Sequence, residues 1–205
     1  MILYKTAARE ASAENEIRKS RFIAYVKPVE SREEADDFIK EIKAKHRDAT
    51  HNVPAMVLGD KMQIQWASDD GEPQGTSGAP IVQMLVSMEI TNVCIVVTRY
   101  FGGIKLGTGG LVRAYTGSAK LGLEAAGIRN VCSRYHAETE IDYSFYDTFN
   151  KMQESGLFTV ENAEYGEKIV LTLSCEEEKE EALKAEISHL TQGRGKILQE
   201  YKKIT

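Results

Sequence analysis

The sequence has few of the features that mark secreted, disulfide-bonded or membrane-spanning proteins. Its three cysteines, Cys94, Cys132 and Cys175, are far apart and form no CxxC pair, so neither a disulfide framework nor a zinc ribbon is indicated. No run approaches the roughly 20 apolar residues of a membrane helix, and the first residues lack the apolar stretch of a signal peptide. We therefore expect a cytoplasmic protein with reduced thiols and no membrane association.

The sequence also lacks a Walker P-loop, a dinucleotide-binding GxGxxG motif and any low-complexity tract. Its composition, 42% hydrophobic and 28% charged, is typical of a folded globular protein. A chain of 205 residues is long enough for two small domains, each with a core of its own. We place their boundary near Asn130, which gives domains of residues 1–130 and 131–205.

Charge is distributed unevenly within the net −5. Residues 1–130 carry 17 basic and 16 acidic side chains, whereas residues 131–205 carry 9 and 15. No acidic residue lies between Glu89 and Glu124, a stretch that contains four basic residues. That stretch is predicted to attract anions, although the whole chain is acidic.

Apolar periodicity and turn residues predict an α+β protein. In the first domain we expect a strand at 21–26, a helix capped by Ser31, a hairpin turning at Gly59-Asp60, and a buried strand at 93–97. Two further helices are expected, over 81–88 with Thr76 or Ser77 as its cap, and from about Leu111 to Gly127. The second domain shows the order strand, helix, strand, strand, helix, strand, with a capping box predicted at Ser174 and Glu177.

The segment Thr98–Arg113 is the strongest candidate binding site, because five glycines lie within nine residues between a buried strand and a helix. Glycine allows backbone N–H groups to approach a ligand, and a helix N-terminus adds unpaired donors, so phosphate is the expected guest. Tyr100 or Phe101 is a candidate for stacking on a base. The alternative is that the glycines only permit a tight turn and that the aromatic residues are core. The predicted phosphate- or nucleic-acid-binding residues are Arg99, Tyr100, Gly102, Gly103, Lys105, Gly107, Thr108, Gly109, Gly110 and Arg113.

A second segment, Ser68–Pro80, carries Asp69, Asp70 and Glu72. These carboxylates are candidates for holding Mg²⁺ or for acting as a general base, and His51 is a candidate acid or base. A simpler interpretation is a loop of turn-forming residues, and no nucleophile accompanies these groups. We therefore predict no metal and no cofactor, and a protein that is not an enzyme.

Both segments resemble the IMPACT family, in its bacterial two-domain branch. The resemblance rests on Ser68–Pro73 with Gly75-Thr76, and on Thr98–Gly103, Lys105–Gly107 and Gly109–Tyr115. Lys19–Ala24 and Thr50–Asn52 are similar to further family motifs, so the resemblance spans roughly residues 15 to 120. It implies a first domain with the two-layer α/β fold of the second domain of ribosomal protein S-five. It also implies a ferredoxin-like second domain similar to domain V of elongation factor G.

The resemblance also implies a role in translation. Eukaryotic IMPACT proteins dampen starvation signalling by competing for a ribosome-associated kinase activator, through an additional N-terminal domain that we do not expect here. Our leading hypothesis is a regulator of translation and stress response that binds RNA, the ribosome or a translation factor. The alternatives are an Mg²⁺-dependent enzyme acting on a phosphorylated or nucleotide small molecule, and a protein–protein adaptor that uses the acidic second domain.

Overall fold

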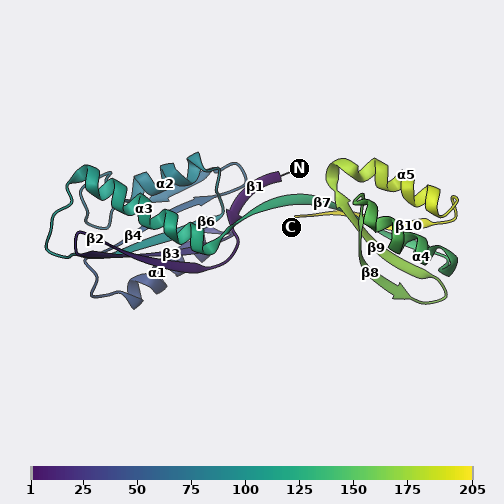
Figure 1. Cartoon of the computed structure of the whole chain (residues 1–205), viewed down its shortest axis with the longest axis horizontal. Helices are drawn as coiled ribbons and strands as arrows, with labels where there is room; N and C mark the ends of the chain where they lie inside the picture. Colours follow the sequence, from purple (N-terminus) through teal and green to yellow (C-terminus); the bar gives the residue numbers. More distant parts are fainter. Residues whose placement is uncertain (1, 205) are drawn as a thin grey trace. The chain divides into compact units, whose positions relative to one another are not determined.

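A computed structural model describes residues 2–204 and divides the chain into two compact units (Figure 1). One unit comprises Tyr4–Asn130, and the other comprises the chain from Val131 onward together with the start of strand β1 (Ile2–Ala7). Each unit has a sheet and a hydrophobic core of its own. The two-domain α+β architecture predicted from the sequence is therefore confirmed.

The first unit is built on a five-stranded antiparallel sheet in the order β2-β3-β6-β4-β5. Its strands are β2 (Ala11–Ile17), β3 (Ser20–Pro28), β4 (His51–Leu58), β5 (Ile64–Ala67) and β6 (Val93–Tyr100). Its helices are α1 (Arg32–Lys45), α2 (Gly78–Ser87) and α3 (Thr108–Ala126). The apolar run at 93–97 forms the central strand β6, which is buried along almost its whole length, as predicted.

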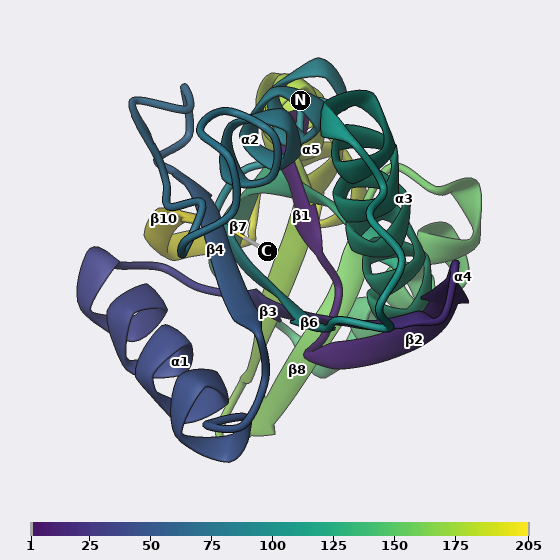
Figure 2. The same ribbon diagram turned by 90° about the vertical axis from the view of Figure 1, so that its left-hand side faces the viewer.

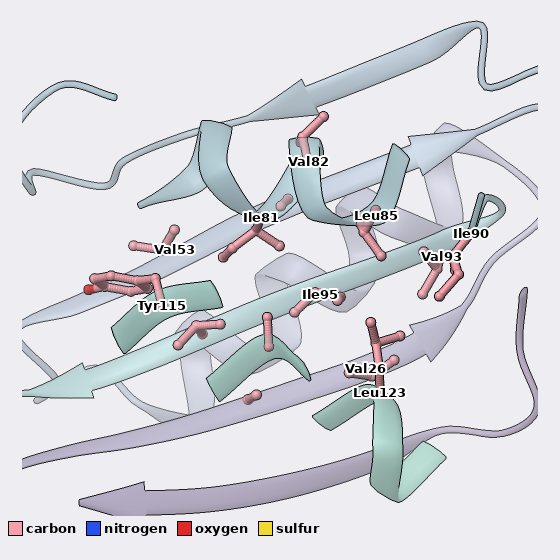
Figure 3. Packing of buried hydrophobic residues seen from close by; sticks show 14 of the residues in the cluster. Val26, Val53, Ile81, Val82, Leu85, Ile90, Val93, Ile95, Tyr115 and Leu123 are labelled. Atoms are coloured by element: carbon pink, nitrogen blue, oxygen red, sulfur yellow. The ribbon is translucent and has the colours of Figure 1, made fainter. Parts of the chain in front are cut away.

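Alternation along the strands divides the core between the two faces of this sheet. Val93, Ile95 and Val97 of β6 point toward α2 and α3, where Ile81, Leu85, Tyr115 and Leu123 complete the larger cluster (Figure 3). Cys94 and Val96 point the other way and pack against α1. Figure 2 shows α1 and α3 on opposite sides of the sheet, so α1 covers the face that a two-layer fold would leave open.

The second unit has the ferredoxin-like arrangement that the sequence predicts. Its strands pair antiparallel in the order β10-β7-β9-β8, and β1 also pairs with β7. Apolar side chains of α4 and α5 share one cluster with β7 and β9. The elements are β7 (Ile128–Ile141), η1 (Tyr143–Phe145), α4 (Tyr146–Met152), η2 (Gln153–Ser155), β8 (Thr159–Tyr165), β9 (Ile169–Glu176), η3 (Glu177–Lys179), α5 (Glu180–Leu190) and β10 (Lys196–Ile204).

The predictions of a two-residue turn in the β4–β5 hairpin and of a helix cap at Ser174 are wrong. The hairpin loop runs from Gly59 to Gln63 and is longer than the predicted two-residue turn. Asn92 and Thr91, which come from another part of the chain, hydrogen-bond to Gly59 and hold this longer loop. Ser174 is not a helix cap, because it is buried within β9, where Arg134 donates to its hydroxyl and the hydroxyl donates to Glu161.

The predicted caps of the first-unit helices have different outcomes. Ser31 does cap α1, because its hydroxyl accepts a hydrogen bond from the Glu34 N–H. At α2, neither Thr76 nor Ser77 supplies the cap. Asp69 does so instead: its Oδ1 accepts from the N–H groups of Ser77 (3.1 Å) and Gly78 (3.0 Å) and from the Ser77 hydroxyl (2.6 Å).

No helix within residues 2–204 is long and apolar enough to cross a membrane. The three cysteines are free thiols, and burial raises the pKa of Cys94 to about 12.

The Asp69 cap predicts a stability difference that depends on pH. Burial raises the pKa of Asp69, but hydrogen bonds from Ser77, Gly75 and Gly78 outweigh it, so the pKa is lowered. Stabilisation by such a carboxylate is complete above its unfolded pKa of about 3.9 and is lost as the pH falls through the lower folded value. We expect Asp69→Ala to reduce the free energy of unfolding by about 1–2 kcal/mol at pH 7 and by less below pH ~4. Urea denaturation at several pH values measures both.

Asp60→Ala is the matched control, because Asp60 is exposed in the β4–β5 loop. It should change the free energy of unfolding by no more than about 0.5 kcal/mol. An equal loss in the two variants would show that Asp69 does not cap α2.

Candidate functional site

The two predicted segments meet at the end of β6, where strand alternation separates Arg99 from Tyr100. Arg99 points toward the α3 side of the sheet, as Val97 and Ile95 do. Tyr100 points to the α1 side, where its hydroxyl lies 2.8 Å from His46 Nδ1 and donates to Asp48 at 3.2 Å. Because Tyr100 is on the opposite side of the sheet, Arg99 and Tyr100 do not form one site.

Arg99 is buried and paired with a carboxylate. Only 5% of the residue is exposed, and Nη1 donates to Glu72 Oε1 at 2.6 Å. The Tyr115 hydroxyl from α3 donates to the same oxygen at 2.7 Å. Burial, followed by the hydrogen bond to Glu72, raises the pKa of Tyr115 far above its usual value, so its hydroxyl remains a donor. The positive charge of Arg99 is therefore balanced inside the protein.

His51, at the start of β4, lies beside this ion pair. Its Nδ1 is 2.8 Å from the carbonyl oxygen of Asp70, and a carbonyl can only accept a hydrogen bond. Nδ1 therefore carries a proton, and Nε2 is an acceptor when the ring is in its neutral form. Nε2 lies 3.8 Å from Glu72 Oε1, and 19% of the His51 side chain is exposed.

The three carboxylates of the acidic loop do not converge. Asp69 caps α2, while Asp70 pairs with Lys43 at 2.6 Å and accepts from the Asn52 N–H at 2.7 Å. Glu72 faces Arg99 and Tyr115. Within residues 2–204, no group of three His, Cys, Asp or Glu side chains is arranged to hold a metal ion. Turn formation and capping account for Asp69 and Asp70.

A cleft of about 440 Å³ separates this loop from the glycine-rich segment. Most of its exposed lining is apolar, and Phe101 is 47% exposed at its edge. The guanidinium of Arg99 lies 5.4 Å from the centre of the Phe101 ring. Phe101, and not Tyr100, is therefore the aromatic residue at the site. The cleft is lined by Thr50, His51, Glu72, Pro73, Arg99, Phe101, Lys105, Leu106, Gly107, Thr108 and Leu111.

The first turn of α3 borders this cleft without a side-chain cap. The first helical hydrogen bond runs from the Leu111 N–H to the Gly107 carbonyl, so the N–H groups of Thr108, Gly109 and Gly110 precede it. No acidic residue lies in this first turn. The helix therefore presents unpaired donors and partial positive charge beside Lys105.

The glycines of this segment have different structural causes. A Cβ on Gly102 would lie 1.9 Å from the carbonyl oxygen of Lys19, so this position admits only glycine. Gly103 and Gly107 adopt φ of +83° and +72°, which L side chains rarely adopt. Gly109 and Gly110 have no positive φ, and a Cβ there would meet no atom as close as at Gly102. A Cβ on Gly109 would meet only the Arg113 side chain, at 3.7 Å.

A second, smaller cavity of about 280 Å³ lies on the other side of Leu106 and is lined by Arg18 and Arg113. Arg18 and Lys19 form the turn between β2 and β3 with φ of 47° and 64°. Sequence reasoning missed Arg18 as a site residue. Two-residue hairpin turns usually carry glycine or asparagine, and Arg-Lys gives no such signal. The alternation on both sides of the turn was the available clue.

Comparison with known proteins identifies the family to which this sequence is similar. The model of the Impact N-terminal domain matches residues 18–123, and a domain of unknown function, DUF1949, matches residues 139–194. IMPACT family member YvyE of Bacillus subtilis is 38% identical over 95% of this chain and 89% of its own length. IMPACT family member YigZ of Escherichia coli is 44% identical over 53% of this chain and 54% of its own length.

A solved structure agrees with these sequence matches. A crystal structure of a hypothetical protein is 30% identical to this chain, covers 95% of it and 96% of its own length, and superposes with a TM-score of 0.58. The sequence matches span both compact units and include the acidic loop and the glycine-rich segment. The chain therefore belongs to the IMPACT family.

Proposed function

We propose that this chain is a non-enzymatic regulator of translation that binds RNA through a basic rim around the first turn of α3. The basic rim consists of Arg18, Lys19, Lys105 and Arg113. The family resemblance supports translation as the process, and the surface chemistry supports RNA as the ligand. This role requires no group transfer.

The observation that carries the proposal is the unbalanced charge of the basic rim. All four side chains are exposed, and none forms an ion pair with a residue between positions 2 and 204. Arg18 and Arg113 line one cavity, while Lys105 lines the neighbouring cleft, and Leu106 contributes to both. Clustered cations without carboxylate partners attract polyanions such as the RNA backbone.

The helix terminus strengthens this surface. Backbone N–H groups at the start of a helix bind phosphate oxygens, and the helix dipole favours negative charge there. The exposed Phe101 adds an aromatic ring of the kind on which unpaired bases stack. Arg99, in contrast, is assigned to holding Glu72 and not to phosphate contact, because its charge is already paired.

Removing two cations of the basic rim should weaken RNA binding in a salt-dependent way. We expect Lys105→Ala/Arg113→Ala to bind single-stranded RNA at least about tenfold more weakly at low salt. The plot of log affinity against log salt should become shallower by roughly 1 to 2, because two phosphate contacts are lost. Fluorescence anisotropy with a labelled oligonucleotide, repeated across a salt series, measures both quantities.

The matched control is Lys61→Ala/Lys151→Ala, which removes the same charge at exposed positions that are not part of the basic rim. It should retain the wild-type salt slope. If wild type does not bind RNA even at low salt, or if the two double variants lose affinity equally, the proposed function is wrong.

The separate role of Arg99 predicts a loss of stability. Arg99→Ala leaves the Glu72 carboxylate buried without its cation, which typically costs about 3–5 kcal/mol. Lys105→Ala, at an exposed position, should change the free energy of unfolding by no more than about 0.5 kcal/mol. Urea denaturation compares the two. A stable Arg99→Ala protein with weak RNA binding would instead assign Arg99 to direct phosphate contact.

A further inference from the structure

The cleft beside the basic rim holds two hydrogen-bond acceptors that receive no hydrogen bond from the described part of the chain. One is His51 Nε2, which is an acceptor in the neutral ring because Nδ1 carries the proton donated to the Asp70 carbonyl. The other is Glu72 Oε2. Both hydrogen bonds that the Glu72 side chain accepts, from Arg99 and Tyr115, go to Oε1, and Oε2 receives none from residues 2–204.

The unsatisfied carboxylate oxygen indicates a ligand. The Glu72 side chain is 4% exposed, and this small exposure leaves Oε2 accessible from the cleft, where a ligand donor can replace water. His51 and Glu72 both line the cleft, and His51 Nε2 is 3.8 Å from Glu72 Oε1. A ligand that fits here must present two neighbouring N–H or O–H donors to these two acceptors.

The rest of the cleft fits a nucleotide. Its volume of about 440 Å³ is in the range of roughly 300–1,000 Å³ that small-molecule sites occupy. Phe101 supplies an aromatic ring at the edge, and Leu106, Leu111 and Pro73 supply apolar walls. Lys105 and the first turn of α3 lie where a phosphate would be held.

We propose that this cleft binds one guanine nucleotide, with the base against Phe101 and its N1–H and N2–H₂ donors directed at Glu72 and His51. Guanine alone among the four RNA bases has two adjacent donors on its Watson–Crick edge. Adenine and cytosine present one amino donor next to a ring-nitrogen acceptor, and uracil presents one N–H between two carbonyl oxygens. Each of these would set an acceptor against an acceptor, which costs binding energy.

The ligand chemistry can come from two sources, a guanosine within an RNA strand or a free guanine nucleotide. The RNA source rests on the proposed function, in which the basic rim holds the flanking phosphates. The free nucleotide does not, because the cleft and the first turn of α3 suffice for it. Separate measurements on mononucleotides and on oligonucleotides distinguish the two sources.

Calorimetry of the full chain with GMP, IMP, AMP, CMP and UMP tests base recognition. GMP should bind most tightly, and IMP, which lacks the N2 amine, should bind about tenfold more weakly because one hydrogen bond is lost. His51→Asn should weaken the binding of GMP about tenfold and leave the affinity for UMP unchanged. The asparagine amide still donates to the Asp70 carbonyl, but the Nε2 acceptor is gone. Equal affinity of wild type for all the mononucleotides, or no binding of any, overturns the proposal.

Phe101→Ala provides a second variant at a position where folding is not at risk, because the side chain is half exposed. It should weaken the binding of every mononucleotide by roughly tenfold or more, because all bases stack on the same ring. Lys105→Ala should also weaken all of them equally. Loss of GMP binding alone in either variant would contradict the assigned roles.

Anisotropy with UUGUU and UUUUU oligonucleotides then identifies the source. Tighter binding of the guanine-containing strand supports a guanosine in RNA. Binding of GMP without binding of either strand supports the free nucleotide and contradicts the proposed function. Equal binding of both strands, without a preference for GMP, leaves the proposed function standing and overturns guanine recognition.

Discussion

The buried ion pair between Arg99 and Glu72 holds together three segments that are distant in the sequence: strand β6, the acidic loop and helix α3. Glu72 Oε1 accepts from Arg99 and from Tyr115, so one carboxylate oxygen fixes the loop against both elements. Removing both charges from water costs free energy, and the close geometry offsets that cost. The pair therefore fixes one wall of the cleft, because Glu72 and Arg99 both line it.

The sequence predicts the elements of the fold better than it predicts the contacts between them. Strand β6 and the ferredoxin-like order follow from local patterns, namely a continuous apolar run and a repeated alternation of strand and helix signals. The Asp69 cap does not follow, because a serine stands at the usual position and the carboxylate comes from eight residues earlier. The partner of Arg99 is 27 residues away and becomes apparent only when the sheet is assembled.

In the candidate site, too, the sequence predicts the segments better than it predicts which side chains meet. Grouping Arg99 with Tyr100 overlooks strand alternation, which places neighbouring residues on opposite faces of the sheet. Both faces of this sheet are buried. The glycine-rich segment combines three separate causes: close packing at Gly102, left-handed backbone at Gly103 and Gly107, and an open helix start at Gly109. Composition alone cannot separate these causes, because each of them favours the same residue.

The two parts of the site fit a division of labour found in nucleic-acid recognition. Contacts to phosphate supply affinity and position without reading sequence, and contacts to base edges supply specificity. The basic rim carries exposed charge and no unsatisfied buried group, which suits the first task. Within the cleft, Arg99 and Glu72 neutralise each other, so Lys105 is the cation of its lining that is unpaired within residues 2–204, and Glu72 and His51 hold acceptor atoms in fixed positions. In the proposed function, the balanced charge of the Arg99–Glu72 pair would let the cleft discriminate by hydrogen-bond pattern, and long-range attraction would come from Lys105, Arg113 and the turn at Arg18 and Lys19.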